Sequence, residues 1–386
     1  MTERLFTPGP VEVPPEALQA ESRPLIHHRT PEFRAELARV FEGLRYVFCT
    51  EDPVLLLAAS GTGGMEAAVA NLVSPGDRVA VVRGGKFGDR WANLAKVYGA
   101  QLTEIPVEWG QAADPAAVRA ALRAQPGVKV MFVTHSETST GVRHDVKQLA
   151  AVAREAGALV VVDAITSLGA MELRPRDWGI DVVVGGSQKG FMIPPGLAFV
   201  SVGPRAREAA AASKSPRFYF DFGRMLKSLE AGDTPFTPAI SLVRALEATL
   251  ERMRAEGLEA MWARHARNGA AARAGMRALG LSIYPRVPSE ALTTVLAPEG
   301  VASDAIIKAV LQQRGLRMAN GQDQLKGKVF RIGHLGVYQA KDILEVVGAV
   351  EEALAGLGQP VKRGAAVAAA QAVYAAPVAA DAGRGA

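Results

Sequence analysis

Short apolar runs alternate with amphipathic helical segments between about residues 50 and 205, and this alternation leaves few possible folds. The runs lack polar alternation, as expected of strands buried on both faces; they are Val54–Ala58, Arg78–Val82, Val128–Val133, Ala158–Val162, Ile180–Val184 and Leu197–Val202. Helical periodicity occupies the intervals, at Met65–Val73, Phe87–Tyr98, Ala116–Ala124 and Val146–Ala156. The pattern predicts an α/β fold with a largely parallel sheet between two layers of helices.

A second, smaller α+β unit is expected after the Pro-rich stretch Thr234–Pro238. Two long helical patterns, Ser241–Glu256 and Leu258–Leu279, precede shorter strand candidates at Ser282–Pro285, Leu292–Leu296 and Val329–Ile332. The expected division is an N-terminal arm (1–14), a large domain (15–258) and a small C-terminal domain (259–361). Residues 362–386 are dominated by alanine and predict a loosely ordered tail, with a short Ala-rich helix as the alternative.

Composition excludes several classes of protein. The 386 residues are 49% hydrophobic and 22% charged, as in ordinary globular proteins. The net charge of +5 is dispersed without a basic block, so no nucleic-acid partner is expected. The single cysteine, Cys49, excludes an internal disulfide framework and a cysteine-based zinc cluster, and no metal is expected. Without a long apolar stretch or signal-peptide pattern, we expect a cytoplasmic protein that does not enter a membrane.

Residues that follow each predicted strand are the candidates for chemistry, because ligands of parallel α/β sheets bind at the carboxyl ends of strands. The Gly-rich turn Ser60–Glu66 opens a helix and could hold an anion, or be a tight turn without a ligand. Thr134–Gly141 is a polar loop after another strand. Asp163 follows four apolar residues, where a carboxylate is costly to bury unless it meets a cation. Lys189 follows a buried strand and small residues, so burial could lower its pKa and make it nucleophilic.

Together these strand ends contain what pyridoxal phosphate requires: an anion cradle, a carboxylate for the ring nitrogen and a lysine for the Schiff base. Ser60–Glu66, Thr134–Gly141, Val161–Gly169 and Gly185–Gly190 resemble the corresponding motifs of class V aminotransferases of fold type I. The resemblance is closest to the alanine–glyoxylate and serine–glyoxylate (serine–pyruvate) aminotransferases, and extends from Thr7–Pro10 to Phe330–Gly336. It implies a mostly parallel seven-stranded sheet and a smaller C-terminal α+β domain.

The resemblance also implies site roles. Lys189 would carry the cofactor and shuttle the proton, and Asp163 would pair with the ring nitrogen. Arg331 would clamp the substrate carboxylate, with Gly9 of the N-terminal arm beside it. The remaining expected cofactor contacts are Thr62, Gly63 and Gln188 at the phosphate, Gly64 without a side-chain role, Phe87 and Ile165 on the two ring faces, and Thr138 at the phenolic oxygen.

Relatives donate a segment similar to Thr234–Pro238 to the neighbouring subunit's phosphate site. Thr237 is therefore expected to contact the partner's cofactor, with Thr234 as the other candidate, and a homodimer with composite sites is expected. The alternative roles for the chain are a cysteine desulfurase, a nicotinamide-dependent oxidoreductase and a non-catalytic partner subunit. Cys49 lies too far upstream for the first, and the Gly-rich turn lacks the glycine spacing of the second.

The expected reaction is ping-pong transfer of an amino group from alanine or serine to glyoxylate or pyruvate. One arginine, Arg331, suits one carboxylate, and we see no second arginine motif for a side-chain carboxylate. Arg29 and Arg83 are the arginines that could reach the site and change this expectation. Aspartate and ureidoglycine are the alternative donors.

Overall fold

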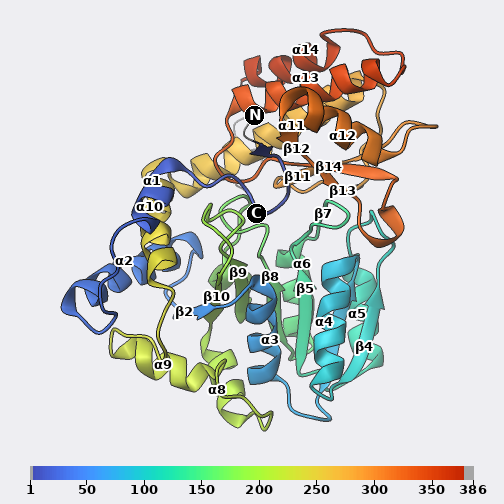
Figure 1. The fold of residues 1–386 in the computed structure, drawn as a ribbon. Helices are drawn as coiled ribbons and strands as arrows, with labels where there is room; N and C mark the ends of the chain where they lie inside the picture. Colours follow the sequence, from blue (N-terminus) through green and yellow to red (C-terminus); the bar gives the residue numbers. More distant parts are fainter. Residues whose placement is uncertain (1–2, 378–386) are drawn as a thin grey trace.

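A computed structural model describes residues 3–377, and within them seven strands form one twisted sheet (Figure 1). In spatial order the strands are β2 (Val54–Ala58), β10 (Leu197–Val202), β9 (Val182–Gly186), β8 (Leu159–Asp163), β5 (Val130–Thr134), β3 (Arg78–Arg83) and β4 (Gln101–Pro106). Strand β10 pairs antiparallel with β2 and with β9, and the other four pairings of this sheet are parallel. The predicted seven-stranded, mostly parallel α/β sheet is confirmed.

The sheet separates two apolar cores. Val160 and Val162 of β8 point into one core, while Val161 between them points into the other. Every residue of β8 is buried, which explains why its sequence has no polar alternation.

Helices contribute to both cores. On the first side lie α2 (Pro31–Val47), α5 (Pro115–Ala124), α6 (Val146–Glu155) and α10 (Ile240–Glu256). On the second side lie α3 (Gly61–Leu72), α4 (Lys86–Val97), α8 (Pro204–Ala212) and α9 (Phe222–Glu230). The short elements are α1 (Pro15–Glu21), α7 (Pro175–Trp178), β6 (Ser136–Glu137) and β7 (Val142–Arg143).

A third core belongs to the C-terminal part of the chain. A three-stranded sheet is formed by β11 (Leu292–Leu296), β14 (Val329–Gly333) and β13 (Ala319–Asn320). It packs with α11 (Leu258–Ala278), α12 (Ser303–Arg314) and α13 (Ala340–Gly356), and a 3₁₀ turn spans Asp323–Leu325. Figure 1 shows these helices gathered at one end of the large sheet.

The Ala-rich segment differs from the loosely ordered tail expected for residues 362–386. Residues Ala365–Ala375 form helix α14, with Ala366 and Ala370 buried in the third core. The small alanine side chains let this helix pack closely against α11 and α13, so the Ala-rich helix that the composition left open is the one formed. Residues 378–386 of the expected tail lie outside the described residues.

Two strand assignments also differ from expectation. Strand β4 was not expected, because it lies at the sheet edge and only Ile105 of its residues is buried. Its sequence therefore lacks the apolar run of an interior strand. Conversely, Ser282–Pro285 was expected to be a strand but contributes only an isolated bridge between Ile283 and Val295.

The N-terminal arm joins the two parts of the chain. Strand β1 (Arg4–Leu5) pairs in parallel with β12 (Leu316–Arg317). Just beyond, the Gly333 N–H donates to the Phe6 carbonyl at 2.6 Å, and the Val11 N–H donates to the Gln188 carbonyl at 3.2 Å. The arm is thereby held by the small sheet and by the loop after β9. Within residues 3–377, no helix has both the length and the apolarity needed to span a membrane.

We expect Gly333→Ala to undock this arm. A Cβ at Gly333 would lie 2.1 Å from the Thr7 carbonyl oxygen, so the backbone must move. The loss should be about 1–3 kcal/mol in the free energy of unfolding, measured by urea titration. Gly356→Ala at the end of α13 is the matched control, because its Cβ would first meet the flexible Gln313 side chain at 3.4 Å. Equal effects of the two substitutions would contradict the tight docking of the arm.

Candidate active site

The candidate site is built at the carboxyl ends of three neighbouring strands. Thr134 at the end of β5 pairs with Asp163 at the end of β8, and Asp163 pairs with Val184 of β9. The loops that follow carry Thr138, Ile165 and Lys189. Parallel pairing in register brings these three loops to one edge of the sheet.

Lys189 contacts the N-terminal arm. Its Nζ donates a hydrogen bond to the Pro8 carbonyl at 2.7 Å. Gly9 has a φ of +141°, and a Cβ there would lie 2.3 Å from Nζ, so a glycine is needed for this approach. Burial lowers the pKa of Lys189 to about 8; the Arg331 and Arg90 charges also lower it, and Asp163 opposes them.

Asp163 is a buried carboxylate with few partners. Its Oδ1 accepts a hydrogen bond from the Ile165 N–H at 2.9 Å. Burial raises its pKa to about 7, and the nearby Glu137 adds to the rise, whereas the Ile165 bond, Arg90 and Lys189 oppose it. A cationic partner would stabilise the ionised form of this buried carboxyl group and lower its pKa.

Arg331 lies in the middle of β14 and is 6% exposed. Its Nε donates to the Asn320 carbonyl and its Nη1 to the Thr138 carbonyl, both at 2.8 Å. No carboxylate forms an ion pair with it in the described part of the chain. Burial lowers its pKa to about 10, with Glu137 opposing. Two backbone bonds fix the guanidinium and leave other N–H donors for an anion.

The predicted phosphate contacts lie in the first turn of α3. Thr62, Gly63 and Gly64 follow Ser60, whose side chain makes no capping hydrogen bond. A Cβ at Gly64 would lie 2.8 Å from Val184 of β9, so this glycine lets the helix pack on the sheet. Close to this sheet edge, Gln188 Oε1 is buried without a hydrogen-bond partner. The free N–H groups of this helix N-terminus suit a bound anion, whereas the unpartnered Gln188 oxygen can only accept a hydrogen bond.

Phe87 is held by Glu137, a residue that was not among the site residues expected from the sequence. Glu137 is fully buried and accepts hydrogen bonds from the N–H groups of Phe87 and Gly88 at 3.1 Å, and of Ser139 at 3.2 Å. Burial raises the pKa of Glu137, and these bonds oppose the rise. The Thr138 hydroxyl lies 2.8 Å from the Thr166 hydroxyl. The available signal is an acidic residue directly after a buried strand, which the sequence alone does not distinguish from ordinary loop polarity.

Arg90 is a second residue that was missed. It lies one turn after Phe87 on α4, and its guanidinium carbon is 4.7 Å from the centre of the Phe87 ring. Its Nη1 donates to the Thr62 hydroxyl at 2.9 Å. The i,i+3 spacing from an expected ring-stacking residue was the signal that could have found it.

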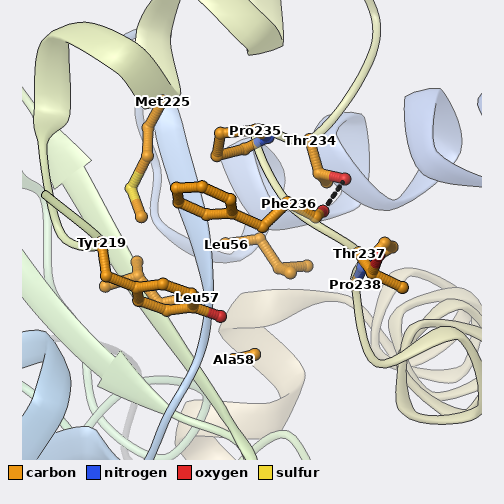
Figure 2. Close-up of a pocket in the computed structure, with 10 residues that line it drawn as sticks. All are labelled: Leu56, Leu57, Ala58, Tyr219, Met225, Thr234, Pro235, Phe236, Thr237 and Pro238. Atoms are coloured by element: carbon orange, nitrogen blue, oxygen red, sulfur yellow. Dashed lines mark hydrogen bonds between the residues drawn. The ribbon is translucent and has the colours of Figure 1, made fainter.

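The structure does not bring Thr234 and Thr237 to Lys189 within one protomer. Both instead line a small pocket with Leu56–Ala58 of β2 and with Tyr219 and Phe236 (Figure 2). Thr234 is buried, and its hydroxyl donates to the Phe236 carbonyl at 2.8 Å. Thr237 is exposed. Of the two candidates, Thr237 has the hydroxyl that is available to another chain.

The two arginines that could have altered the substrate expectation have carboxylate partners elsewhere. Arg29 pairs with Asp233 at 2.6 Å, and Arg83 pairs with Asp89 at 2.6 Å and with Glu104. Both guanidinium groups thus already have carboxylate partners within the chain. The described residues contain no group of three or more His, Cys, Asp or Glu side chains that could hold a metal ion.

These residues fit pyridoxal phosphate. The amine of Lys189 and the carboxyl of Asp163 both have pKa values displaced toward neutrality, and the N-terminus of α3, where the predicted phosphate contacts Thr62 and Gly63 lie, has no side-chain cap. Thr62, Gly63 and Gln188 would hold the phosphate, and Asp163 the ring nitrogen.

Comparisons with known proteins agree with the geometry. The family described as "Aminotransferase class-V" matches residues 16–341. The "Soluble hydrogenase, small subunit" of a Synechococcus strain is 46% identical over 92% of this chain and 93% of its own. The L-aspartate–glyoxylate aminotransferase of Paracoccus denitrificans is 38% identical over 96% of both chains. The structure of ureidoglycine–glyoxylate aminotransferase from Bacillus subtilis superposes with a TM-score of 0.90, at 30% identity over 97% of this chain and 98% of that one.

We expect Asp163→Asn to stabilise the cofactor-free chain, and more so at pH 8 than at pH 5. The folded pKa of about 7 lies above the ordinary value of 3.8, so losing the proton destabilises the fold, and the penalty grows as pH rises between these values. Asparagine cannot ionise and avoids the penalty. Thermal midpoints measured at the two pH values test this.

Asp323→Asn serves as the control, because Asp323 is an exposed carboxylate outside the site. It should change the midpoint little at either pH. A gain for Asp163→Asn that does not depend on pH would contradict the proposed burial of charge.

Proposed function

Because the chain belongs to the class-V aminotransferase family, we propose that it is a transaminase that uses pyridoxal phosphate and transfers an amino group to glyoxylate. The family depends on this cofactor. The single observation that carries the proposal is that Lys189 and Asp163, at one edge of the large sheet, lie close enough to Arg331 of the small sheet for both the Asp163 and the Arg331 charges to shift the pKa of Lys189.

Pyridoxal phosphate, when bound, supplies an electrophilic carbon and a ring that accepts electrons. The lowered pKa of Lys189 gives it more neutral amine at physiological pH than an ordinary lysine, which favours covalent attachment. The same amine, released by substrate, would move the proton at the substrate α-carbon. Asp163 would hold a proton at the ring nitrogen, because the carboxylate gains a cationic partner that it lacks in the free chain.

Arg331 would orient the substrate by its α-carboxylate. A planar guanidinium can donate two parallel hydrogen bonds to a carboxylate, and its two backbone bonds already fix its plane. Glyoxylate is a carboxylate with one further carbon, so this clamp suffices to bind it. The names of the Paracoccus and Bacillus relatives both include glyoxylate, which supports it as acceptor over pyruvate.

We propose alanine or serine as donor, because Arg331 is the arginine available for one carboxylate and both Arg29 and Arg83 are paired elsewhere. Aspartate is the second candidate, and the name of the Paracoccus relative favours it. An aspartate donor would need a second cation at the side-chain carboxylate.

The proposed assembly is a homodimer in which Thr237 reaches the partner's cofactor phosphate. Thr237 is exposed beside an aromatic group of Tyr219, Phe236 and Phe218, and Phe218 is 66% exposed. Exposed aromatic side chains of this size are typical of a surface that is covered in an oligomer.

We expect Lys189→Ala to abolish the visible absorption band of covalently held cofactor and nearly all turnover. Lys86→Ala, which removes an exposed lysine paired with Asp323, should keep both. Absorption spectra and a glyoxylate assay measure the two readouts. If Lys189→Ala kept the band and its activity, the proposed function would be wrong.

The donor is tested by comparing kcat/KM for alanine, serine, aspartate and glutamate with glyoxylate as acceptor. We expect alanine or serine to exceed both dicarboxylates. Arg331 is assigned to the α-carboxylate, and the other arginine of the site, Arg90, is bonded to the predicted phosphate contact Thr62, so a second carboxylate has no cation assigned to it. Aspartate exceeding both small donors by about tenfold, or about 1.4 kcal/mol in barrier, would select the second candidate.

We expect a dimer or larger assembly at low micromolar concentration, with Thr237→Val weakening cofactor binding. Thr234→Val is the matched control: it removes a hydroxyl that bonds within its own loop, so it should lower the thermal midpoint more than the cofactor affinity. Size-exclusion chromatography with light scattering and cofactor titration measure these effects. An active monomer would contradict the composite site.

A further inference from the structure

The predicted phosphate contacts contain no positive charge. Thr62, Gly63, Gln188 and Thr237 offer hydroxyl, amide and backbone donors only. A phosphate group carries between one and two negative charges near neutral pH. Holding an anion partly out of water costs free energy unless a cation or several strong donors contact it. These four residues therefore leave the negative charge of the phosphate without a cation.

Arg90 is the cation in contact with this set. Its Nη1 donates to the Thr62 hydroxyl at 2.9 Å, which places the guanidinium beside the first turn of α3. Its guanidinium carbon lies over the Phe87 ring, 4.7 Å from the ring centre, so the guanidinium has a second contact besides Thr62. Thr62 and Phe87 are the residues expected at the phosphate and the ring of the cofactor.

The charge of Arg90 is not neutralised within the chain. It forms no ion pair with any carboxylate among residues 3–377, unlike the other cations around the start of α4. Arg83 is paired with Asp89 and Glu104, and Lys86 with Asp323. Arg90 also influences the pKa values of both Asp163 and Lys189, so its charge acts on the site and not only on solvent.

We propose that Arg90 is an additional cofactor-binding residue, whose guanidinium balances the charge of the phosphate group from the α4 side. The inference rests on the proposed function. Contact with the Phe87 ring and the bond to the Thr62 hydroxyl together hold the guanidinium beside the phosphate donors. Arg90 thereby links the phosphate contacts to the ring-stacking residue.

The test compares pyridoxal phosphate with pyridoxal, which has the same ring and aldehyde but no phosphate. Dissociation constants of both are measured by absorption titration of the cofactor-free full chain, for wild type, Arg90→Gln, Arg90→Lys and the control Arg83→Gln. Arg90→Gln should weaken pyridoxal phosphate binding by about tenfold or more and pyridoxal binding by less than about twofold. Arg90→Lys should restore part of the loss, and Arg83→Gln should change neither.

Each outcome has a defined meaning. A phosphate-specific loss supports the proposal. An equal loss of affinity for both compounds would mean that Arg90 only packs against Phe87. No loss of affinity would mean that Arg90 does not contribute to phosphate binding. Either result overturns the proposal while the transaminase function stands. If wild type fails to bind pyridoxal phosphate at all, the proposed function fails and the inference fails with it. Thermal midpoints of the variants identify any that are misfolded.

Discussion

Much of the site depends on placing charged groups where water is largely excluded. The Asp163 carboxyl and the Lys189 amine lie at the ends of strands whose other residues are entirely apolar, and each group stabilises the charge of the other against the cost of burial. The surrounding contacts are few: one N–H from Ile165 on the carboxyl and the Pro8 carbonyl on the amine. Both groups are therefore left with capacity to bind something else.

Glu137 connects this charged centre to the surrounding frame. It fastens the start of α4 to the loop after β5 through three backbone N–H groups. The same loop supplies the Thr138 carbonyl that fixes Arg331 of the small sheet. A single buried carboxylate thus couples the helix that carries Phe87 and Arg90 to the strand that carries Arg331.

The sequence predicts strands best where their residues are buried on both faces of the sheet. Interior strands such as β8 and β10 were predicted because both faces are covered, and the resemblance to class V aminotransferases is confirmed by the family match. Edge strand β4 was missed because half-exposed residues leave no apolar run. The residues of the site were selected as strand ends and by resemblance, whereas Arg90 lies within a helix and Glu137 within a polar loop. Their importance depends on contacts between distant segments, which local pattern does not encode.

The N-terminal arm has a consequence for how the molecule is made. Strand β1 pairs with β12, which begins at Leu316, and Pro8 accepts the hydrogen bond of Lys189. During synthesis the arm must therefore remain undocked until β12, far later in the sequence, has been made. Contacts of such high sequence separation are slow to form, and β1 is too short to act as a template for other chains meanwhile. The Pro8 carbonyl can therefore complete the Lys189 environment only in a chain that already contains β12 and Gly333, the two anchors of the arm.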